Sequence, residues 1–310
     1  MSLAATAFNQ IMIMFLLILV GIFCYRMKLI DKITNKKLSD MVLMLVNPIV
    51  IIISYQRKFE GTLLTGLLIS FILAVVTHIF GIVIGYVIIR GNKHKADLAI
   101  ERFAVIYSNC GFIGIPMAGG LFGSEGVFYI TAYMTIFNLL VWTHGVIIMT
   151  GKTDTKSMTK ALLSPSVIAT VVGFLLFVTR ITLPETLSDT LTYLGNMNTP
   201  LAMLVSGITI AQTDLKKLFL KFRIYYLSFL KLLFVPIAML FLFRLFNLPN
   251  VVLLTSVLAA ACPSAVTISL FAIRYEKNYL YASEIFAVST ISSLLTIPLV
   301  MYIANLVLYR

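Results

Sequence analysis

Residues 109–120 read NCGFIGIPMAGG, and residues 258–267 read LAAACPSAVT. Both stretches lie inside long apolar runs, at places where a continuous helix would need helix-forming residues. Proline removes one backbone donor and clashes with the carbonyl group four residues earlier, and glycine weakens a helix further. Each stretch therefore predicts an interrupted helix. In a bilayer, such a break is tolerated only where protein, water or a ligand satisfies the freed backbone groups.

The composition excludes most soluble classes of protein. Apolar residues make up 60% of the 310 residues, and charged residues make up only 12%. A soluble domain carries about 25% charged residues, so this chain cannot cover a water-exposed surface of its size. A soluble enzyme, a disordered tail and a nucleic-acid binder are disfavoured. The chain reads as an all-α integral membrane protein whose partner is the lipid bilayer, and at about 20 residues per span its length allows roughly ten helices.

Ten apolar runs follow one another along the chain, and three of them are weaker than the others as predicted helices. The runs at 97–122, 187–211 and 250–273 are interrupted by Gly, Pro and Asn. We expect membrane helices at 8–25, 39–55, 62–90, 97–122, 126–150, 163–180, 187–211, 222–246, 250–273 and 280–308.

Lysine and arginine residues gather in alternate connections between these runs. Eighteen of the 24 lie in the connections that follow the first, third, fifth, seventh and ninth runs, and five lie on the other side. Under the positive-inside rule this predicts an even number of spans, a multi-pass protein of the cell membrane, and both termini outside. The net charge of +12 then needs no nucleic-acid partner.

The chain repeats itself weakly after about 150 residues. The tripeptide LSD opens the second run at 38–40 and the seventh run at 187–189, and Pro48 and Pro200 follow. We expect a first five-helix repeat at 1–150, a short cytoplasmic linker at 151–162 and a second repeat at 163–310. Because five is odd, the second repeat must be inverted, and inverted repeats with paired broken helices are typical of secondary transporters.

The two broken helices supply the candidate binding site. After Pro116 and Pro263 a half-helix can restart with proline in its favoured first turn, and its N-terminus carries a partial positive charge and free donors that attract an anion. We expect the two ends to meet near mid-membrane, where Cys110 also comes close to Cys262. The candidate substrate-binding residues are Asn109, Gly111, Gly114, Pro116, Cys262, Pro263, Ser264, Thr267 and Lys231.

Four residues carry charges or titratable groups in or near the membrane. Lys231 lies inside the eighth run, where it either pairs with a substrate carboxylate or extends to the interface. His78 lies in the third run, as a carrier of a coupling proton or as a hydrogen-bonded packing residue. Glu101 and Arg102 precede the interrupted part of the fourth run, on its basic side, and we expect them to pair at the surface.

No enzymatic motif accompanies these features. The chain lacks a GxxxxGK[ST] phosphate loop, an HExxH pair and the Cys and His spacing of a metal site. We therefore expect no enzyme, no catalytic residue, no cofactor and no metal.

Residues 109–117, NCGFIGIPM, resemble the N-x-G-F-x-G-I-P-L signature of the auxin efflux carrier family and its bacterial members. The segments at 25–48 and 263–298 resemble that family as well. The resemblance implies ten helices in two inverted sets, with helices 4 and 9 crossing at their prolines. It also implies a scaffold (spans 1, 2, 6 and 7), a moving transport part (spans 3–5 and 8–10) and a homodimer. The short linker resembles that of bacterial members, which are assigned to malate, malonate or similar acids.

These expectations combine into a function. We expect a secondary transporter that moves small organic anions, such as mono- or dicarboxylates, by alternating access, with the site where helices 4 and 9 cross. One alternative is a sodium-coupled symporter of the bile-acid-symporter type, although the interrupted part of the ninth run has no acidic residue to hold sodium. The other is a membrane sensor or binding subunit that does not transport.

Overall fold

The computed structural model describes residues 3–91, 95–152, 159, 162–213 and 221–308. All regular structure in these ranges is helical and no strand occurs in them, which confirms the predicted all-α class. Most of the predicted linker at 151–162 lies outside the described residues, as do several of the basic residues used to orient the chain, such as Lys93, Lys156 and Lys216.

Every apolar run of the first half forms helix. The segments are α1 (Leu3–Arg26), α2 (Lys32–Met41), η1 (Val42–Val46), α3 (Asn47–Ser54), α4 (Gly61–Val87), α5 (Lys95–Ile106), η2 (Cys110–Gly114), α6 (Ile115–Leu140), η3 (Val141–Gly145) and α7 (Val146–Thr150). The η segments are single π-helical turns that continue directly into an α-helix, a feature frequently found at functional sites.

The second half forms a similar series. Its segments are α9 (Pro165–Thr179), α10 (Glu185–Asn196), α11 (Asn198–Ala211), α13 (Phe222–Phe229), η4 (Leu230–Phe234), α14 (Val235–Arg244), α15 (Asn250–Ala261), α16 (Thr267–Arg274) and α17 (Tyr279–Leu308). In both halves a proline, Pro48 or Pro236, follows a π-helical turn directly, at a place where its missing donor disturbs the regular ladder least.

Six helices of the described part are long and apolar enough to cross a membrane, and two shorter apolar helices accompany them, Pro165–Thr179 and Asn250–Ala261. The chain is therefore a multi-pass membrane protein. Fewer than ten long helices result because the breaks divide some of the apolar runs into shorter helical segments. One of the six, Cys110–Thr150, joins the end of the fourth predicted run to the fifth, and its only non-helical residue is Gly123 with φ 62°.

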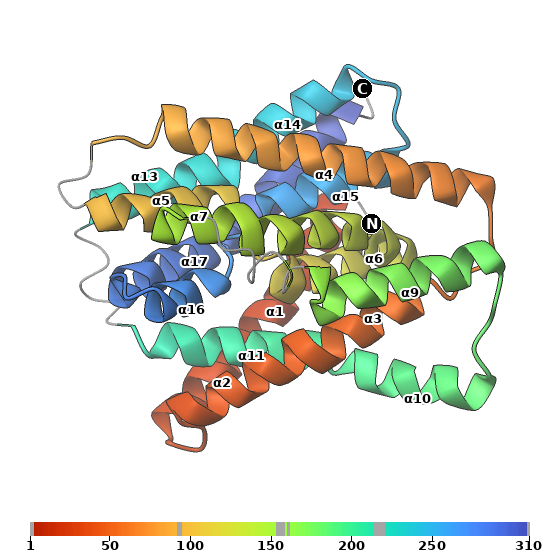
Figure 1. The fold of residues 1–310 in the computed structure, drawn as a ribbon, viewed down its shortest axis with the longest axis horizontal. Coiled ribbons are helices and arrows are strands. Elements are labelled where there is room, and N and C mark those ends of the chain that lie inside the picture. Colours follow the sequence, from red (N-terminus) through yellow and green to blue (C-terminus); the bar gives the residue numbers. More distant parts are fainter. Residues whose placement is uncertain (1–2, 92–94, 153–158, 160–161, 214–220, 309–310) are drawn as a thin grey trace.

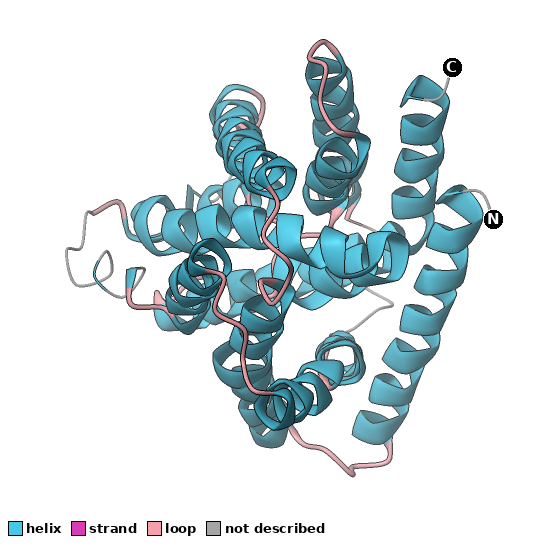
Figure 2. Ribbon diagram, turned by 90° about the vertical axis from the view of Figure 1, so that its right-hand side faces the viewer, coloured by secondary structure: helices cyan, strands magenta, loops and turns pink. Residues whose placement is uncertain are grey.

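The connections lie at two opposite ends of the molecule. Figure 1 shows the α4–α5 and α16–α17 connections at one end, and the α3–α4 and α9–α10 connections at the other. Helices α1 and α17 pack side by side, so the two ends of the described chain are neighbours (Figure 2).

Helix α1 packs most extensively against α11, and two glycines make this possible. A Cβ atom added to Gly207 would overlap the carbonyl oxygen of Ile18, and one added to Gly21 would overlap that of Leu204. The two backbones are therefore in direct contact, as in the small-residue interfaces of membrane helices. This contact joins the first helix of one half to a helix of the other half.

We expect Gly207→Val to separate α1 from α11. Overpacking of this kind costs about 1–3 kcal/mol, so the melting temperature of the purified protein in detergent should fall by several degrees. The matched control is Gly61→Val, because a Cβ at Gly61 would meet nothing within 4 Å. Equal melting temperatures for the two variants would contradict the close contact.

Candidate functional site

Both predicted breaks are present, although one of them lies earlier than expected. Helix α5 ends at Ile106, residues 107–109 are not helical, and helix resumes at Cys110. The prediction that the half-helix restarts after Pro116 was wrong, because the π-helical turn η2 runs continuously into the first turn of α6, where Pro116 is tolerated. The second break spans residues 262–266, and α16 begins at Thr267, after Pro263 as predicted.

The two breaks meet, and we call residues 107–109 and 262–266 together the crossing. Ser108 and Ser264 form an isolated antiparallel β-bridge. The Asn109 backbone N–H donates to the Pro263 carbonyl at 2.7 Å, and the Ala265 N–H donates to the Tyr107 carbonyl at 2.9 Å. Each break thus satisfies backbone groups that the other has freed, which is the condition for keeping irregular backbone inside a membrane.

Serine side chains complete the hydrogen bonding of the crossing. The Ser264 hydroxyl donates to the Ala104 carbonyl at 2.9 Å, a group near the end of α5. The Ser264 N–H donates to Ser289 Oγ at 3.2 Å, on α17. Ser264 therefore links three helical segments by hydrogen bonds, and its hydroxyl group already donates its proton to a carbonyl group of the protein.

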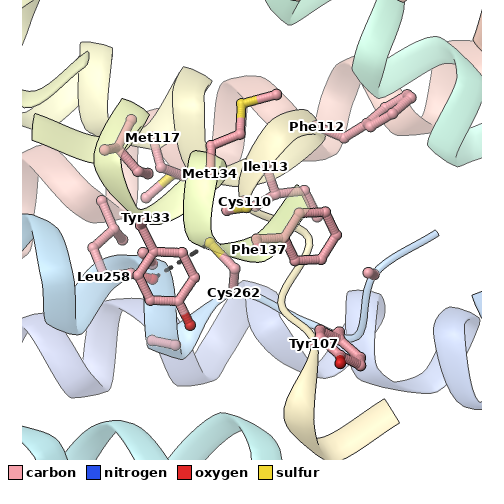
Figure 3. Packing of buried hydrophobic residues seen from close by; sticks show 14 of the residues in the cluster. Tyr107, Cys110, Phe112, Ile113, Met117, Tyr133, Met134, Phe137, Leu258 and Cys262 are labelled. Atoms are coloured by element: carbon pink, nitrogen blue, oxygen red, sulfur yellow. Dashed lines mark hydrogen bonds between the residues drawn. The ribbon is translucent and has the colours of Figure 1, made fainter. Parts of the chain in front are cut away.

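Small residues pack closely together on one side of the crossing. The thiols Cys110 and Cys262 lie side by side (Figure 3), as the sequence predicted, and both are free. A Cβ atom added to Gly114 would come within 3.3 Å of Cys110 Cβ, 3.4 Å of Cys262 Sγ and 2.9 Å of Ile130 Cδ1. Gly114, Pro116 and Cys262 are therefore packing residues in this conformation.

A cavity of about 700 Å³ lies beside the crossing. Asn109, Gly111 and Phe112 line it from the first break, and Ala265, Val266 and Thr267 line it from the second. The other lining residues are Leu43, Met44, Met134, Phe137, Asn138, Val141, Trp142, Thr159, Leu163, Ser164, Pro165, Ser166 and Arg274. The cavity is thus mainly apolar, with a few polar groups at defined places, as small-molecule sites usually are.

Several polar atoms of the lining have no hydrogen-bond partner among the described residues. They are the amide nitrogens of Asn109 and Asn138 and the hydroxyl groups of Ser164 and Thr267. The N–H groups of Gly111 and Phe112 also lie in the first turn of a helical segment, where no preceding carbonyl is available. Buried donors without partners are costly, so a ligand or water that accepts hydrogen bonds is favoured here.

The cavity lining carries one charged residue within the described part of the chain, the cation Arg274. Arg274 stands exposed at the end of α16, with its guanidinium 5.6 Å from the ring centres of both Trp142 and Tyr275. It lies seven residues, or roughly 10 Å of helix, beyond Thr267. The cavity therefore has neutral donors at the crossing and a cation at its outer end.

Lys231 lies near the crossing, although it does not line the cavity. Its side chain is 1% exposed and donates to Ser108 Oγ at 2.5 Å. Ser108 Oγ also lies 3.3 Å from the Tyr133 hydroxyl. The alternative in which Lys231 extends to the membrane interface is therefore wrong, because its ammonium group is bound inside the protein.

His78 is fully buried on α4. Its Nδ1 lies 2.8 Å from the Ala74 carbonyl, and its ring centre lies 4.7 Å from that of Tyr133. Nε2 has no partner among the described atoms. The packing interpretation of His78 thus matches its surroundings, while its free nitrogen keeps the proton-carrying interpretation open.

The ten predicted site residues fall into three groups. Asn109, Gly111 and Thr267 line the cavity. Cys262, Pro263 and Ser264 belong to the second break of the crossing, and the other four do not line the cavity: Gly114, Pro116, Lys231 and His78. Asn138, Ser164 and Arg274 of the lining were not predicted from the sequence. Arg274 lies seven residues after Thr267, a spacing that places both on one helix face.

Glu101 corrects another expectation. The predicted surface pair with Arg102 does not form, and Glu101 is instead fully buried. Arg223 binds both of its carboxylate oxygens, at 3.1 and 2.7 Å, and Tyr281 donates to it at 2.9 Å. Arg102 instead donates to the Gly85 carbonyl and lies 4.3 Å from the Tyr86 ring centre. Glu101 thereby fixes α5, which leads into the crossing, to α13 and α17.

The geometry can now be compared with known proteins. A family model described as a membrane transport protein matches residues 6–158 and 152–301. The chain belongs to this family, that of the auxin efflux carriers and their relatives. The resemblance seen in residues 109–117 is thus confirmed over almost the whole chain.

Proteins called uncharacterised transporters are similar to it. One from Methanothermobacter thermautotrophicus is 29% identical over 204 residues, covering 63% of this chain and 65% of the relative. One from Methanocaldococcus jannaschii is 25% identical over 92% of this chain and 95% of its own length. The Escherichia coli K12 protein YfdV is 24% identical over 70% of this chain and 71% of its own length. The matched region thus spans just under two thirds of the first of these relatives.

We expect Glu101→Gln to destabilise the protein without removing the crossing. The amide keeps one acceptor for Tyr281 or Arg223 and loses the charged pair, at a cost of about 1–3 kcal/mol. Thermal melting in detergent measures the loss. Glu276→Gln, at an exposed glutamate at the end of α16, is the control. Equal melting of Glu101→Gln and the unmodified protein would contradict the role assigned to the carboxylate.

Proposed function

We propose that this chain is a secondary transporter that moves small organic anions, such as mono- or dicarboxylates, across the cell membrane by alternating access. Its substrate site is the cavity at the crossing. The observation that carries the proposal is the meeting of two broken helices beside a cavity of about 700 Å³ whose unpartnered polar atoms are mostly donors. An organic anion supplies the acceptors that those donors lack.

The charges support an anion over a cation. The described lining contains Arg274 and no acidic residue, whereas a sodium site needs several oxygen ligands, usually including carboxylates. The carboxylate of the substrate binds Asn109 and Thr267 together with the first-turn N–H groups at Gly111. These are neutral donors at helix N-termini, the arrangement that discontinuous membrane helices use for anionic groups.

The proposal includes an architecture of ten membrane helices in two inverted repeats. Three pairs of residues that meet in space lie at corresponding places of the two halves: Asn47 with Asn198, Ser108 with Ser264, and Cys110 with Cys262. Their separations are 151, 156 and 152 residues, close to the repeat of about 150. Residues near a two-fold axis meet their own counterparts, and the pairing across the axis is antiparallel. Both features support inverted halves.

The asymmetry of the crossing supports alternating access. Arg274 is an exposed residue of the lining at the end of α16, and the α16–α17 and α4–α5 connections lie at the same end of the molecule (Figure 1). We place that end in the cytoplasm and both termini outside. Lys231 lies behind the crossing, where it meets the substrate once the transport part has moved against the scaffold. His78 is the candidate for coupling a proton to that step.

We expect Asn109→Ala to reduce uptake strongly. Loss of a hydrogen bond to a charged group costs about 1.5–3 kcal/mol, so uptake of a labelled carboxylate into proteoliposomes should fall roughly 10- to 100-fold. Membrane insertion and melting temperature should change little, because the Asn109 backbone bond to Pro263 remains. Asn305→Ala on α17, outside the cavity, is the control. Unreduced uptake by Asn109→Ala would remove this residue from the site.

Arg274→Gln should weaken capture of the anion from the cytoplasmic side. An exposed cation contributes up to about 1 kcal/mol, so KM should rise roughly two- to fivefold while the maximal rate stays close to normal. The increase should appear in inside-out vesicles and diminish at high salt. Lys277→Gln, a neighbouring cation that does not line the cavity, should not change KM. An equal effect of both variants would argue for general surface charge.

A further inference from the structure

Two buried asparagines beside the crossing have no role in the site described so far. Asn47 begins α3 and is fully buried, and Asn198 begins α11 and is 3% exposed. The Asn198 amide donates to Asn47 Oδ1 at 2.5 Å. Neither residue lines the cavity, and both precede a proline, Pro48 or Pro200, near a place where their helix is interrupted.

This pair is only half satisfied. Asn47 Nδ2 and Asn198 Oδ1 have no partner among the described residues. Exchanging the nitrogen and oxygen positions of both amides would leave Asn47 Oδ1 and Asn198 Nδ2 free instead. One donor and one acceptor of the pair therefore stay unpartnered whichever way the amides are assigned. Two leucines would fill the same space without this penalty, because each buried polar atom without a partner destabilises the folded protein.

The pair lies directly behind the wall of the cavity. Leu43 and Met44, which line the cavity, precede Asn47 by about one helical turn on the same helix. A Cβ atom added to Gly111 would come within 3.1 Å of Asn47 Nδ2. Gly111 itself lines the cavity, so the Asn47 amide lies behind a residue of the cavity wall.

We propose that Asn47 and Asn198 form a second polar subsite, which binds a hydroxyl group of the transported anion. This inference rests on the proposed function, because alternating access moves the broken helix, and Gly111 with it, relative to α3 and α11. The amide pair then joins the cavity.

A hydroxyl group matches the unpartnered atoms. It accepts one hydrogen bond and donates one, so it pairs with the free amide nitrogen and the free amide oxygen together. A carboxylate accepts only and would leave the free oxygen unpaired. The carboxylate therefore binds at Asn109 and Thr267, and the amide pair distinguishes hydroxylated acids from their simple analogues. A site built to bind a hydroxyl rejects the analogue that lacks it, because its own polar groups are then left unpaired.

The test uses pairs of acids that differ only by a hydroxyl group: lactate against propionate, and malate against succinate. Each acid competes against uptake of a labelled carboxylate in proteoliposomes, and each is also tested by thermal shift of the purified protein. In the unmodified protein the hydroxylated member of at least one pair should bind about tenfold more tightly. In Asn47→Leu with Asn198→Leu, that preference should fall below about twofold.

The variants separate specificity from stability. Replacing both partners by apolar groups of similar shape is nearly neutral for folding, and the melting temperature checks this. Asn47→Ser with Asn198→Ser is the second variant, because serine is polar and too short to reach the same hydroxyl. Asn196→Leu, at an exposed asparagine two residues before Asn198, is the matched control and should keep the preference.

Each outcome decides the question. A preference that survives in both double variants overturns the subsite and leaves the pair as packing. Binding of the acids by the unmodified protein without any preference for the hydroxyl also overturns it, while leaving the proposed transport of organic anions intact. If none of the four acids binds or is transported, the proposed function fails for small acids and the subsite fails with it.

Discussion

The constraint behind this structure is the need to satisfy free backbone groups inside a membrane. Two helices stop at Ile106 and Ala261, deep among other helices, and each stop leaves carbonyl and N–H groups without intrahelical partners. The hydrogen bonds from Asn109 to Pro263 and from Ala265 to Tyr107 satisfy some of these groups within the crossing. The first-turn N–H groups that face the cavity have no such partner in the described part of the chain. The proposed function rests on these free donors.

The sequence predicted the helices and the existence of both breaks, because proline and glycine have local effects that are independent of the fold. It misplaced the restart of the first half-helix, because Pro116 is accommodated in the first turn of α6 after a π-helical turn, a geometry without a clear sequence signal. It also paired Glu101 with its neighbour in sequence. The actual partner, Arg223, lies 122 residues away, and only tertiary packing brings the two together.

The candidate site was predictable to a similar extent. Asn109 and Thr267 line the cavity because they flank the breaks, and their place in the sequence already indicated this. Asn138, Ser164 and Arg274 come from other segments and carry no local signal. The asparagine pair was overlooked because Pro48 and Pro200 resemble ordinary kinks. Its meaning depends on two unpartnered atoms, which only the three-dimensional arrangement reveals.

His78 and Lys231 are 153 residues apart, close to the repeat of about 150 residues in the sequence, and both are buried near the crossing. Lys231 donates to Ser108 Oγ, and the same oxygen lies 3.3 Å from the Tyr133 hydroxyl, whose ring packs on His78. One serine of the first break thus stands between the two groups. In the proposed transporter, a change of charge on either group would alter the hydrogen bonding of Ser108, directly or through Tyr133. Coupling through the crossing would then need no acidic residue in the broken helices.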